Sequence, residues 1–139
     1  MEENLCVLNY VDQLRNLSSR YIQVEIEIVP NIFKWCEEKG VSEDHPFRIA
    51  KALKNLENGR YLILINQYLT SENISSVLTG IEHSNYFSID QIKKITDQKI
   101  FLIHLLLHEI SHVLDETRTE EQCDHWALNQ IETNQLTLD

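Results

Sequence analysis

The sequence is poor in the residues that mark linkers, disulfide scaffolds and nucleic-acid-binding surfaces. Its 139 residues include only three Gly and two Pro, which argues against long disordered linkers. The three Cys residues are far apart and form no CxxC pair, so we expect reduced thiols in a cytoplasmic protein. With 12 Lys and Arg against 22 Asp and Glu, the net charge is −10. This excess of acid argues against direct binding to nucleic acid or to an acidic membrane surface.

A membrane-spanning hydrophobic segment is missing as well. The apolar run at residues 100–107 is too short to cross a bilayer and contains His104. The first ten residues start acidic and lack the apolar stretch of a signal peptide. We therefore expect a soluble cytoplasmic protein in which residues 1–139 form one domain.

Hydrophobic periodicity predicts α+β structure in the first half of the chain. We expect an amphipathic helix over about residues 4–17, a half-buried strand over 21–29, and a short helix over 31–40 that ends at Gly40. Residues 45–59 are predicted to form another helix, stopped at Asn58-Gly59, and residues 60–66 a strand buried on both faces. The segment 67–87 is ambiguous: it has a helical turn over 72–78 and room for a third strand.

The second half of the chain is predicted to be helical. Ser88 and Gln91 form a capping box that opens a long helical pattern reaching Leu114, with Asp97 as a point where the helix can break. A final helix is expected over about residues 120–130. The expected architecture is a small mixed sheet with the long helix and the final helix packed beneath it.

Residues 108–112, near the end of the long helix, read HEISH and match the pattern HExxH. An α-helix turns about 100° per residue, so His108 and His112 project from one face and can bind one Zn²⁺ ion. Glu109 then projects beside the ion and suits a general base that takes a proton from water. The alternative is a buried helix in which both histidines serve only as hydrogen-bonded core residues.

The segment after this motif resembles the ligand helix of the gluzincin zinc peptidases. In that family HExxH is followed by a pattern like E-x-x-[AS]-[DN]-x-[FW]-A, and residues 120–127 read EEQCDHWA. The resemblance covers roughly residues 104–128 and is closest to the small zincin-like domains of the ImmA/IrrE peptidases. It implies that Glu120 is the third zinc ligand and that Asp124 orients one of the ligand histidines.

Within the resembling segment, Cys123 occupies a small-residue position. The chain departs from the family pattern in two ways: Ser111 stands where many relatives have Gly, and only seven residues separate His112 from Glu120. This tight connection leaves the third ligand open among Glu116, Glu120 and Glu121. Spacing favours Glu120, because it lies one helical turn before the expected orienting carboxylate.

Other polar residues near the motif have competing interpretations. His104 lies one turn before the motif and is expected to be structural or to line a pocket, since three stacked histidines cannot all reach one tetrahedral ion. His125 is an alternative ligand to Glu120. Cys123 is a candidate metal ligand as well, but a small buried thiol is the commoner state of such a residue. Tyr86 or Tyr68 is a candidate to stabilise an oxyanion.

The sequence thus predicts a zinc metallopeptidase that hydrolyses peptide bonds. The strand at 60–66 is a candidate edge for pairing with an extended peptide or protein substrate. The resemblance suggests a repressor-type regulator as one such substrate, with any link to DNA running through a basic partner protein. The alternative is a catalytically silent zinc-binding protein with a regulatory or interaction role.

Overall fold

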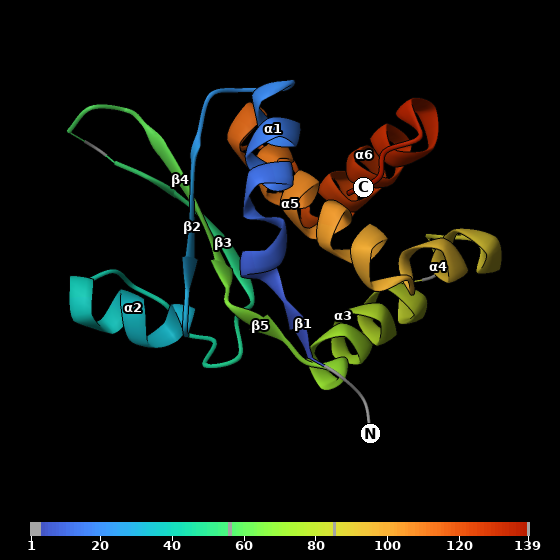
Figure 1. Cartoon of the computed structure of the whole chain (residues 1–139), viewed down its shortest axis with the longest axis horizontal. Helices are drawn as coiled ribbons and strands as arrows, with labels where there is room; N and C mark the ends of the chain where they lie inside the picture. The colour runs from blue at the N-terminus through green and yellow to red at the C-terminus, as the bar shows by residue number, and fades with distance from the viewer. Residues whose placement is uncertain (1–3, 56, 85, 139) are drawn as a thin grey trace.

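The computed structural model describes residues 4–55, 57–84 and 86–138. Helices and short strands alternate in an α+β fold (Figure 1). In chain order the elements are β1 (Leu5–Cys6), the 3₁₀ helix η1 (Val7–Tyr10), α1 (Val11–Ser19), β2 (Glu25–Val29), α2 (Ile32–Lys39), β3 (Ala50–Lys54), β4 (Tyr61–Asn66), β5 (Tyr68–Leu69), α3 (Ser71–His83), α4 (Ile89–Ile95), α5 (Gln98–Leu114) and α6 (Glu120–Asn134).

A mixed three-stranded sheet separates two layers of helices. Its order is β2-β4-β3, with β2 parallel and β3 antiparallel to β4. Side chains alternate across β4, so Ile63 and Ile65 join the larger core with α1 and α5, whereas Leu64 packs with Ile32 and Cys36 near α2. Figure 1 shows α2 on one side of the sheet and α1 and α5 on the other. The predicted strand at 60–66, buried on both faces, is confirmed.

Helix α5 runs through the middle of the fold and carries the HExxH motif. Residues 101–107 are all buried, as in a helix surrounded by protein on every side. The Asp97 carboxylate accepts hydrogen bonds from two backbone N–H groups of the first turn and so begins the helix. The long helical pattern therefore breaks at Asp97, and the predicted capping box of Ser88 and Gln91 begins the separate helix α4.

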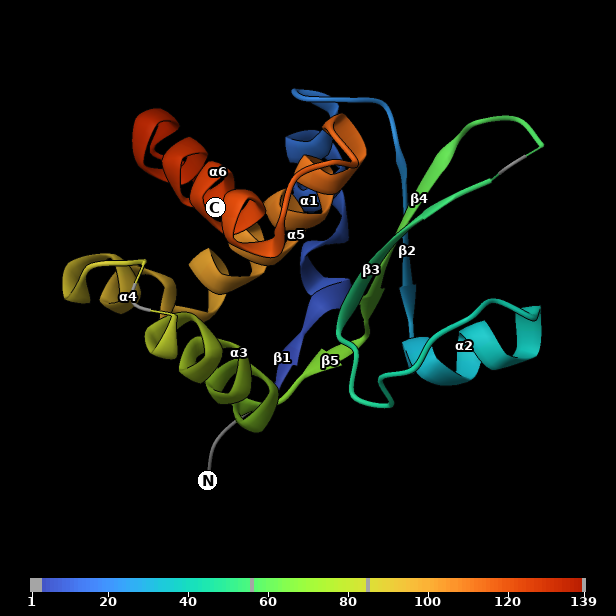
Figure 2. The same cartoon turned by 180° about the vertical axis from the view of Figure 1, so that it is seen from behind.

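Helix α6 packs chiefly against α5. A capping box of Thr119 and Gln122 begins it directly after a short connection. Figures 1 and 2 show α6 on the side of α5 that faces away from the sheet. The expectation that both helices lie beneath the sheet is therefore correct for α5 and wrong for α6.

Residues 45–59 contain a strand and a hairpin turn, so the helix predicted there is wrong. Strand β3 pairs antiparallel with β4, from Ala50 opposite Ile65 to Lys54 opposite Tyr61. Gly59 has a positive φ of 71°, which Gly adopts more readily than other residues in a tight turn. The Asn-Gly dipeptide is a hairpin signal, and here it turns the chain between two strands rather than ending a helix.

The N-terminal helix begins later than predicted, at Val11. Leu5 and Cys6 pair instead with Leu69 and Tyr68 of β5, and this short ladder supplies the third strand suspected within 67–87. Helix α3 occupies most of the remaining ambiguous segment. The strand predicted over 21–29 is confined to β2, while the helices predicted over 31–40 and 120–130 are confirmed as α2 and α6.

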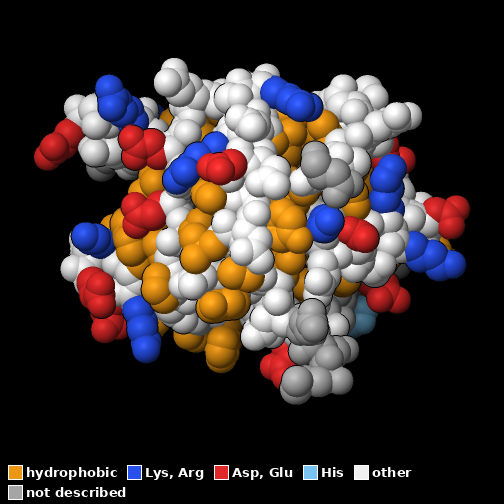
Figure 3. Space-filling view, viewed as in Figure 1, with side chains coloured by type: hydrophobic (Ala, Val, Ile, Leu, Met, Phe, Trp, Pro, Cys, Tyr) orange, Lys and Arg blue, Asp and Glu red, His pale blue; other side chains and the backbone are white. Residues whose placement is uncertain are grey.

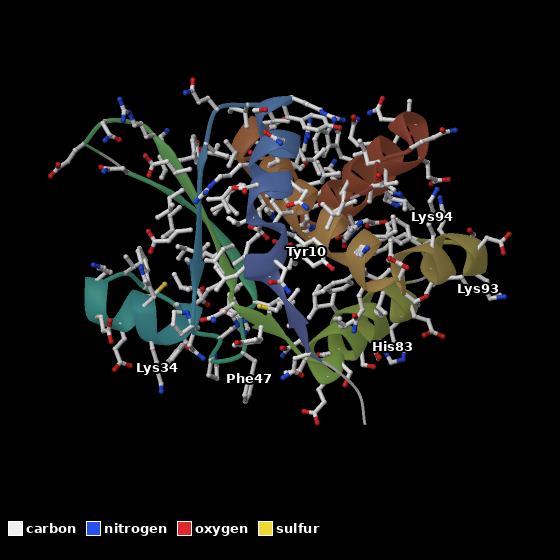
Figure 4. All side chains as sticks on the ribbon, viewed as in Figure 1. Tyr10, Lys34, Phe47, His83, Lys93 and Lys94 are labelled. Atoms are coloured by element: carbon white, nitrogen blue, oxygen red, sulfur yellow. The ribbon has the colours of Figure 1, made fainter. Side chains whose placement is uncertain are left out.

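The surface combines charges of both signs with a few exposed hydrophobic side chains. In Figure 3 hydrophobic side chains gather in the central and lower-left part of the face, with charged side chains around the perimeter. Phe47 is 82 % exposed and projects outward from the loop before β3 (Figure 4). Within the described ranges, no helix is both long enough and apolar enough to cross a membrane.

Candidate metal centre

His108 and His112 lie one turn apart near the C-terminal end of α5. Their Nε2 atoms are 3.2 Å apart, because residues at i and i+4 project from the same helix face. The two side chains are 12 % and 25 % exposed. The helix is held in the core by its apolar faces, so both rings are turned toward one point at the edge of the core.

The Glu120 carboxylate reaches the same point from the first turn of α6. Its Oε2 lies 2.6 Å from Nε2 of His108 and its Oε1 lies 3.2 Å from Nε2 of His112. Hydrogen bonds from these two rings hold the pKa of the Glu120 carboxyl far below its usual range. Its side chain is 76 % exposed, so the converging groups face solvent on one side.

The two competing carboxylates point elsewhere. Glu116 accepts a hydrogen bond from the Tyr61 hydroxyl and lies 3.9 Å from Lys54. Glu121 lies 3.9 Å from His125 on its own helix. Of the three glutamates that spacing leaves open, Glu120 is the one that approaches the histidine pair.

A side chain of the connection between α5 and α6 binds to the HExxH motif and holds the connection against α5. Arg118 donates a hydrogen bond from Nη1 to Oγ of Ser111 at 2.8 Å, and its guanidinium lies 5.7 Å from the centre of the Trp126 ring. Ser111 is fully buried. The residue that departs from the gluzincin pattern thus helps to hold the short return that delivers Glu120 to the histidines.

Asp124, one turn after Glu120, accepts hydrogen bonds from three side chains. Its Oδ1 lies 2.7 Å from Nδ1 of His108 and 3.1 Å from Nε2 of His104, and Oδ2 lies 2.6 Å from the Tyr86 hydroxyl. Burial raises the pKa of Asp124, but these hydrogen bonds outweigh burial and leave the pKa well below its usual range. Because Asp124 engages Nδ1 of His108, it leaves Nε2 directed at the convergence point.

The donor set fits a divalent cation. Burial lowers the pKa of His108, but the hydrogen bonds to Asp124 and Glu120 outweigh it and raise the pKa to about 11. In the chain alone this ring therefore holds a positive charge between two carboxylates. A metal ion takes the place of such a proton when it binds, and two imidazoles with one carboxylate form a typical Zn²⁺ ligand set.

Cys123 also lies within reach of the histidines. Its Sγ atom is 3.5 Å from Nδ1 of His112, and one potential ligand atom from each of His108, His112 and Cys123 fits within 4.8 Å of the others. Burial raises the pKa of the Cys123 thiol. Since Sγ faces Nδ1 while Glu120 faces Nε2, the thiol stands on the opposite side of the His112 ring. The sequence interpretation weighed Cys123 as a metal ligand and favoured a small buried thiol; the thiol is buried, and its place against His112 was not predicted.

Glu109 is buried beside the histidine pair, with 9 % of its surface exposed. Burial raises its pKa, an effect that the neighbouring histidines oppose. Glu109 and Arg48 line both a cavity of about 530 Å³, which also reaches His108 and Glu120, and a cavity of about 330 Å³, which reaches His112. Glu109 therefore stands where the two cavities meet.

Of the remaining candidate site residues from the sequence, some lie at the larger cavity and others do not. Tyr86 lines the larger cavity, whereas Tyr68 lies on β5 and is absent from the described lining of both cavities. His125 contacts the rings of Tyr86 and Phe87 and does not approach the pair on α5 in the described contacts. His104 is 3 % exposed, and its Nδ1 has no hydrogen-bond partner among the described residues; it lines the larger cavity, in line with the expectation for it.

The strand beside the site is β3 rather than β4. Strand β4 is central, with hydrogen-bonded neighbours on both sides, so the prediction that residues 60–66 form an edge for substrate is wrong. Within the described sheet β3 is an edge strand, and three of its residues line the smaller cavity together with Glu109 and His112. Figure 2 shows β3 beside α5.

Comparison of the chain with protein-family models, curated proteins and solved structures gives no match in any of the three.

Proposed function

We propose that this chain is a zinc-dependent peptidase with a zincin-like fold, in which His108, His112 and Glu120 hold the ion. One observation carries the proposal: a carboxylate from α6 approaches two imidazoles of α5 at 2.6 and 3.2 Å. These side chains come from an HExxH motif and from a helix that resembles the gluzincin ligand helix. Their residue types match those that Zn²⁺ prefers in catalytic sites with an open coordination position.

Glu109 is the proposed general base. Zinc, when bound, supplies a Lewis acid that polarises the scissile carbonyl and makes a water more acidic. Glu109 takes the proton from the attacking water and delivers it to the leaving amine. Burial favours this role, because it brings the proton affinity of the carboxylate closer to that required near neutral pH. Asp124 contributes by holding the His108 ring in one orientation.

The proposed substrate is an extended peptide or protein segment. Among the residues that the structure describes, strand β3 has no strand paired on its outer side, and it lies beside Glu109. Peptides commonly bind such edges by adding a strand. We propose a regulatory protein of the repressor type as the biological substrate. The net charge of −10 supports a link to DNA only through such a basic partner.

The metal proposal is tested with a matched pair of variants. We expect one zinc per purified chain by mass spectrometry of the metal content. Glu120→Gln is expected to lose at least tenfold in zinc affinity, whereas Glu121→Gln, one residue along the same helix, is expected to keep the wild-type affinity. Equal affinities of the two variants would contradict the proposed ligand set.

The catalytic proposal needs a separate measurement. Glu109→Gln is expected to retain zinc and to lose at least 100-fold in the hydrolysis of denatured casein, because a general base contributes roughly 10²–10⁴ in rate. Zinc-loaded wild-type protein without detectable hydrolysis would remove the peptidase proposal and leave the metal site.

One observation favours a second candidate, a metal-binding protein without turnover. Cys123 offers an alternative ligand group, because one ligand atom from each of His108, His112 and Cys123 lies within 4.8 Å of the others. A thiolate among the ligands is typical of the closed sites of structural zinc. Cobalt-substituted protein distinguishes the two candidates, because a thiolate ligand gives a charge-transfer absorption band. If this band appears and is lost in Cys123→Ser, the closed site is correct; if it is missing, the open catalytic site is supported.

A further inference from the structure

The larger cavity joins the candidate metal centre to an apolar wall. Its volume is about 530 Å³, and its lining includes His108, Glu109 and Glu120 at one end. The loop before β3, α3 and α5 supply the other walls. The apolar lining residues of these walls and of the first position of β3 include Ile49, Ala50, Val77, Ile81, Phe101 and Leu105. A group held in this cavity therefore touches hydrocarbon on several sides and the proposed reacting groups on one side.

Gly80 leaves this cavity open on the side of α3. A Cβ atom built at Gly80 would meet no heavy atom of the described chain within 4 Å, and Gly80 lines the cavity. In the middle of a helix Gly is about 1 kcal/mol less favourable than Ala. Packing inside the folded chain does not require the missing side chain, so the space beside Gly80 is available to a ligand.

Two of the three carboxylates in the cavity lining are already engaged by other side chains of the protein. Asp124 already accepts three hydrogen bonds, and Glu120 is engaged by both histidines. Of the three carboxylates in the lining, only Glu109, the proposed general base, would be left to pair with a lysine side chain. An acidic side chain would face Glu109 and Glu120, and the lining cation Arg48 is already bound to Glu43. Burial of an unpaired charge is costly. The walls thus favour an uncharged, apolar occupant.

Phe47 extends the apolar surface to the cavity mouth. It belongs to the lining although it is 82 % exposed, and Figure 4 shows it projecting from the loop before β3. An aromatic ring in this position gains buried area when a ligand covers it. The next residues along the chain enter β3, so a peptide paired with that edge passes directly by the mouth.

We propose that this cavity binds one bulky apolar side chain, of the size of Leu, Met or Phe, next to the scissile bond of a peptide. This inference rests on the proposed peptidase function for the position of the bond, and on the cavity itself for the chemistry of the side chain. Strand pairing supports a single occupant, since alternate side chains of an extended peptide point to opposite faces. Gly80 and the apolar walls of α3 and α5 determine the size that is accepted.

Cleavage-site mapping in a mixed peptide library tests the selectivity. We expect Leu, Met or Phe at one fixed position to be enriched at least tenfold over Asp, Lys and Gly, as for a pocket that recognises several methylene groups. Gly80→Leu fills the cavity and is expected to lower kcat/KM for Phe-containing peptides at least tenfold while changing that for Ala-containing peptides less than threefold. Thr79→Leu adds the same side chain to an exposed neighbour outside the cavity lining and should leave both values unchanged.

A binding measurement on metal-free protein separates this inference from the peptidase proposal. N-acetyl-leucine amide and N-acetyl-phenylalanine amide should shift the backbone NMR signals of Val77, Gly80 and Ile81 in wild-type protein but not in Gly80→Leu; N-acetyl-aspartate amide should shift neither. Binding without any hydrolysis supports the cavity assignment and removes the peptidase. If peptides are hydrolysed with no preference for Leu, Met or Phe at any position, or if all three amides give equal shifts, the cavity assignment is wrong while the peptidase proposal stands.

Discussion

Asp124 connects the candidate metal centre to the core through three hydrogen bonds. Two donors are histidines from successive turns of α5, and the third is the Tyr86 hydroxyl, whose pKa is raised by burial and by this same carboxylate. A carboxylate with two oxygens can accept all three donors, whereas an amide has a single oxygen acceptor. The charge and the shape of this side chain therefore both matter to the direction of the His108 ring.

Asp124→Asn is expected to weaken zinc binding by roughly 10- to 100-fold, the usual effect of removing a carboxylate that orients a ligand histidine. Competition with a fluorescent zinc chelator measures the affinity. Asp90→Asn, on the exposed first turn of α4, is the control and should bind as the wild type does. If both variants retain wild-type affinity, Asp124 does not orient a metal ligand.

At the scale of elements, the β3–β4 hairpin forms one wall of the site. The turn at Gly59 fixes the pairing that places Ala50 opposite Ile65. Before the strand, Glu43 accepts hydrogen bonds from Lys51 at 2.7 Å and from Arg48 at 3.2 Å. Turn and ion pairs together hold the loop that carries Phe47 against the rest of the cavity.

Substitution by Ala should change the free energy of unfolding in opposite directions at Gly59, in the hairpin turn, and at Gly80, on α3. Gly59→Ala is expected to lower the free energy of unfolding by about 1 kcal/mol, since its φ of 71° is unfavourable for a residue with a Cβ. Gly80→Ala, on helix α3, is expected to raise it by about 1 kcal/mol. Urea titrations followed by circular dichroism measure both. A stabilising Gly59→Ala would contradict the turn geometry.

The ion pairs of Glu43 predict a pH dependence of stability. Burial raises the pKa of Glu43, but hydrogen bonds from Lys51, the His45 backbone and Arg48 outweigh it and lower the pKa from 4.5 to about 2. The stabilisation is therefore fully present above pH 4.5 and is lost as the pH falls through 2. Glu43→Gln should cost about 1–2 kcal/mol at pH 7, allowing for solvent near these groups, and progressively less below pH 4.5. Glu38→Gln, at an exposed position, is the control: the difference in free energy of unfolding between this variant and the wild type should stay small at every pH.

Local sequence signals identified two strands and several helices, but they assigned a helix to the segment that forms β3. The capping residue Ser88 acts on backbone groups a few positions away, so the start of α4 was visible in the sequence, whereas Asp97 was interpreted only as a point where one long helix can break. Strand β3 was missed because Ala and Lys are ordinary helix formers, and its pairing with β4 is a tertiary interaction that overrides this preference. Asn58-Gly59 was the signal that would have found it.

The same distinction applies to the candidate site. The HExxH spacing fixes the relative directions of His108 and His112 within one helix. The sequence did not place Cys123 against the ring of His112, because that contact depends on how α6 rotates against α5. The cavity depends on longer-range packing among the loop before β3, α3 and α5. Hydrophobic periodicity in the sequence does not predict such packing.

At the scale of the whole molecule, the net charge and the proposed metal site both bear on the stability of the folded chain. The chain carries a net charge of −10, and α5 contributes both a large part of the buried core and two of the proposed zinc ligands. Binding of a dication reduces the net negative charge and joins α5 to α6. A ligand that binds only the folded state stabilises it in proportion to its saturation.

Metal removal should therefore lower the melting temperature. Free zinc at 100 times its Kd adds about 2.7 kcal/mol, equivalent to about 10 °C for a chain of this size. Differential scanning calorimetry with and without EDTA measures the difference. Glu120→Gln is the control, because its melting temperature should change little on addition of EDTA. Identical wild-type curves would show that no stabilising ion is bound.

The proposed zinc-binding side chains, with Asp124 and His104, all lie between residues 104 and 124 on two adjacent helices, whereas the cavity walls also draw on residues 45–50 and 77–86. A helical hairpin has few long-range contacts and forms quickly, while strand pairing across long loops forms slowly. We therefore expect the proposed zinc ligands to come together during folding before the proposed substrate wall is formed. On this expectation, a chain with α5 and α6 assembled but β3 undocked would hold the proposed zinc ligands together without the proposed peptide-binding wall.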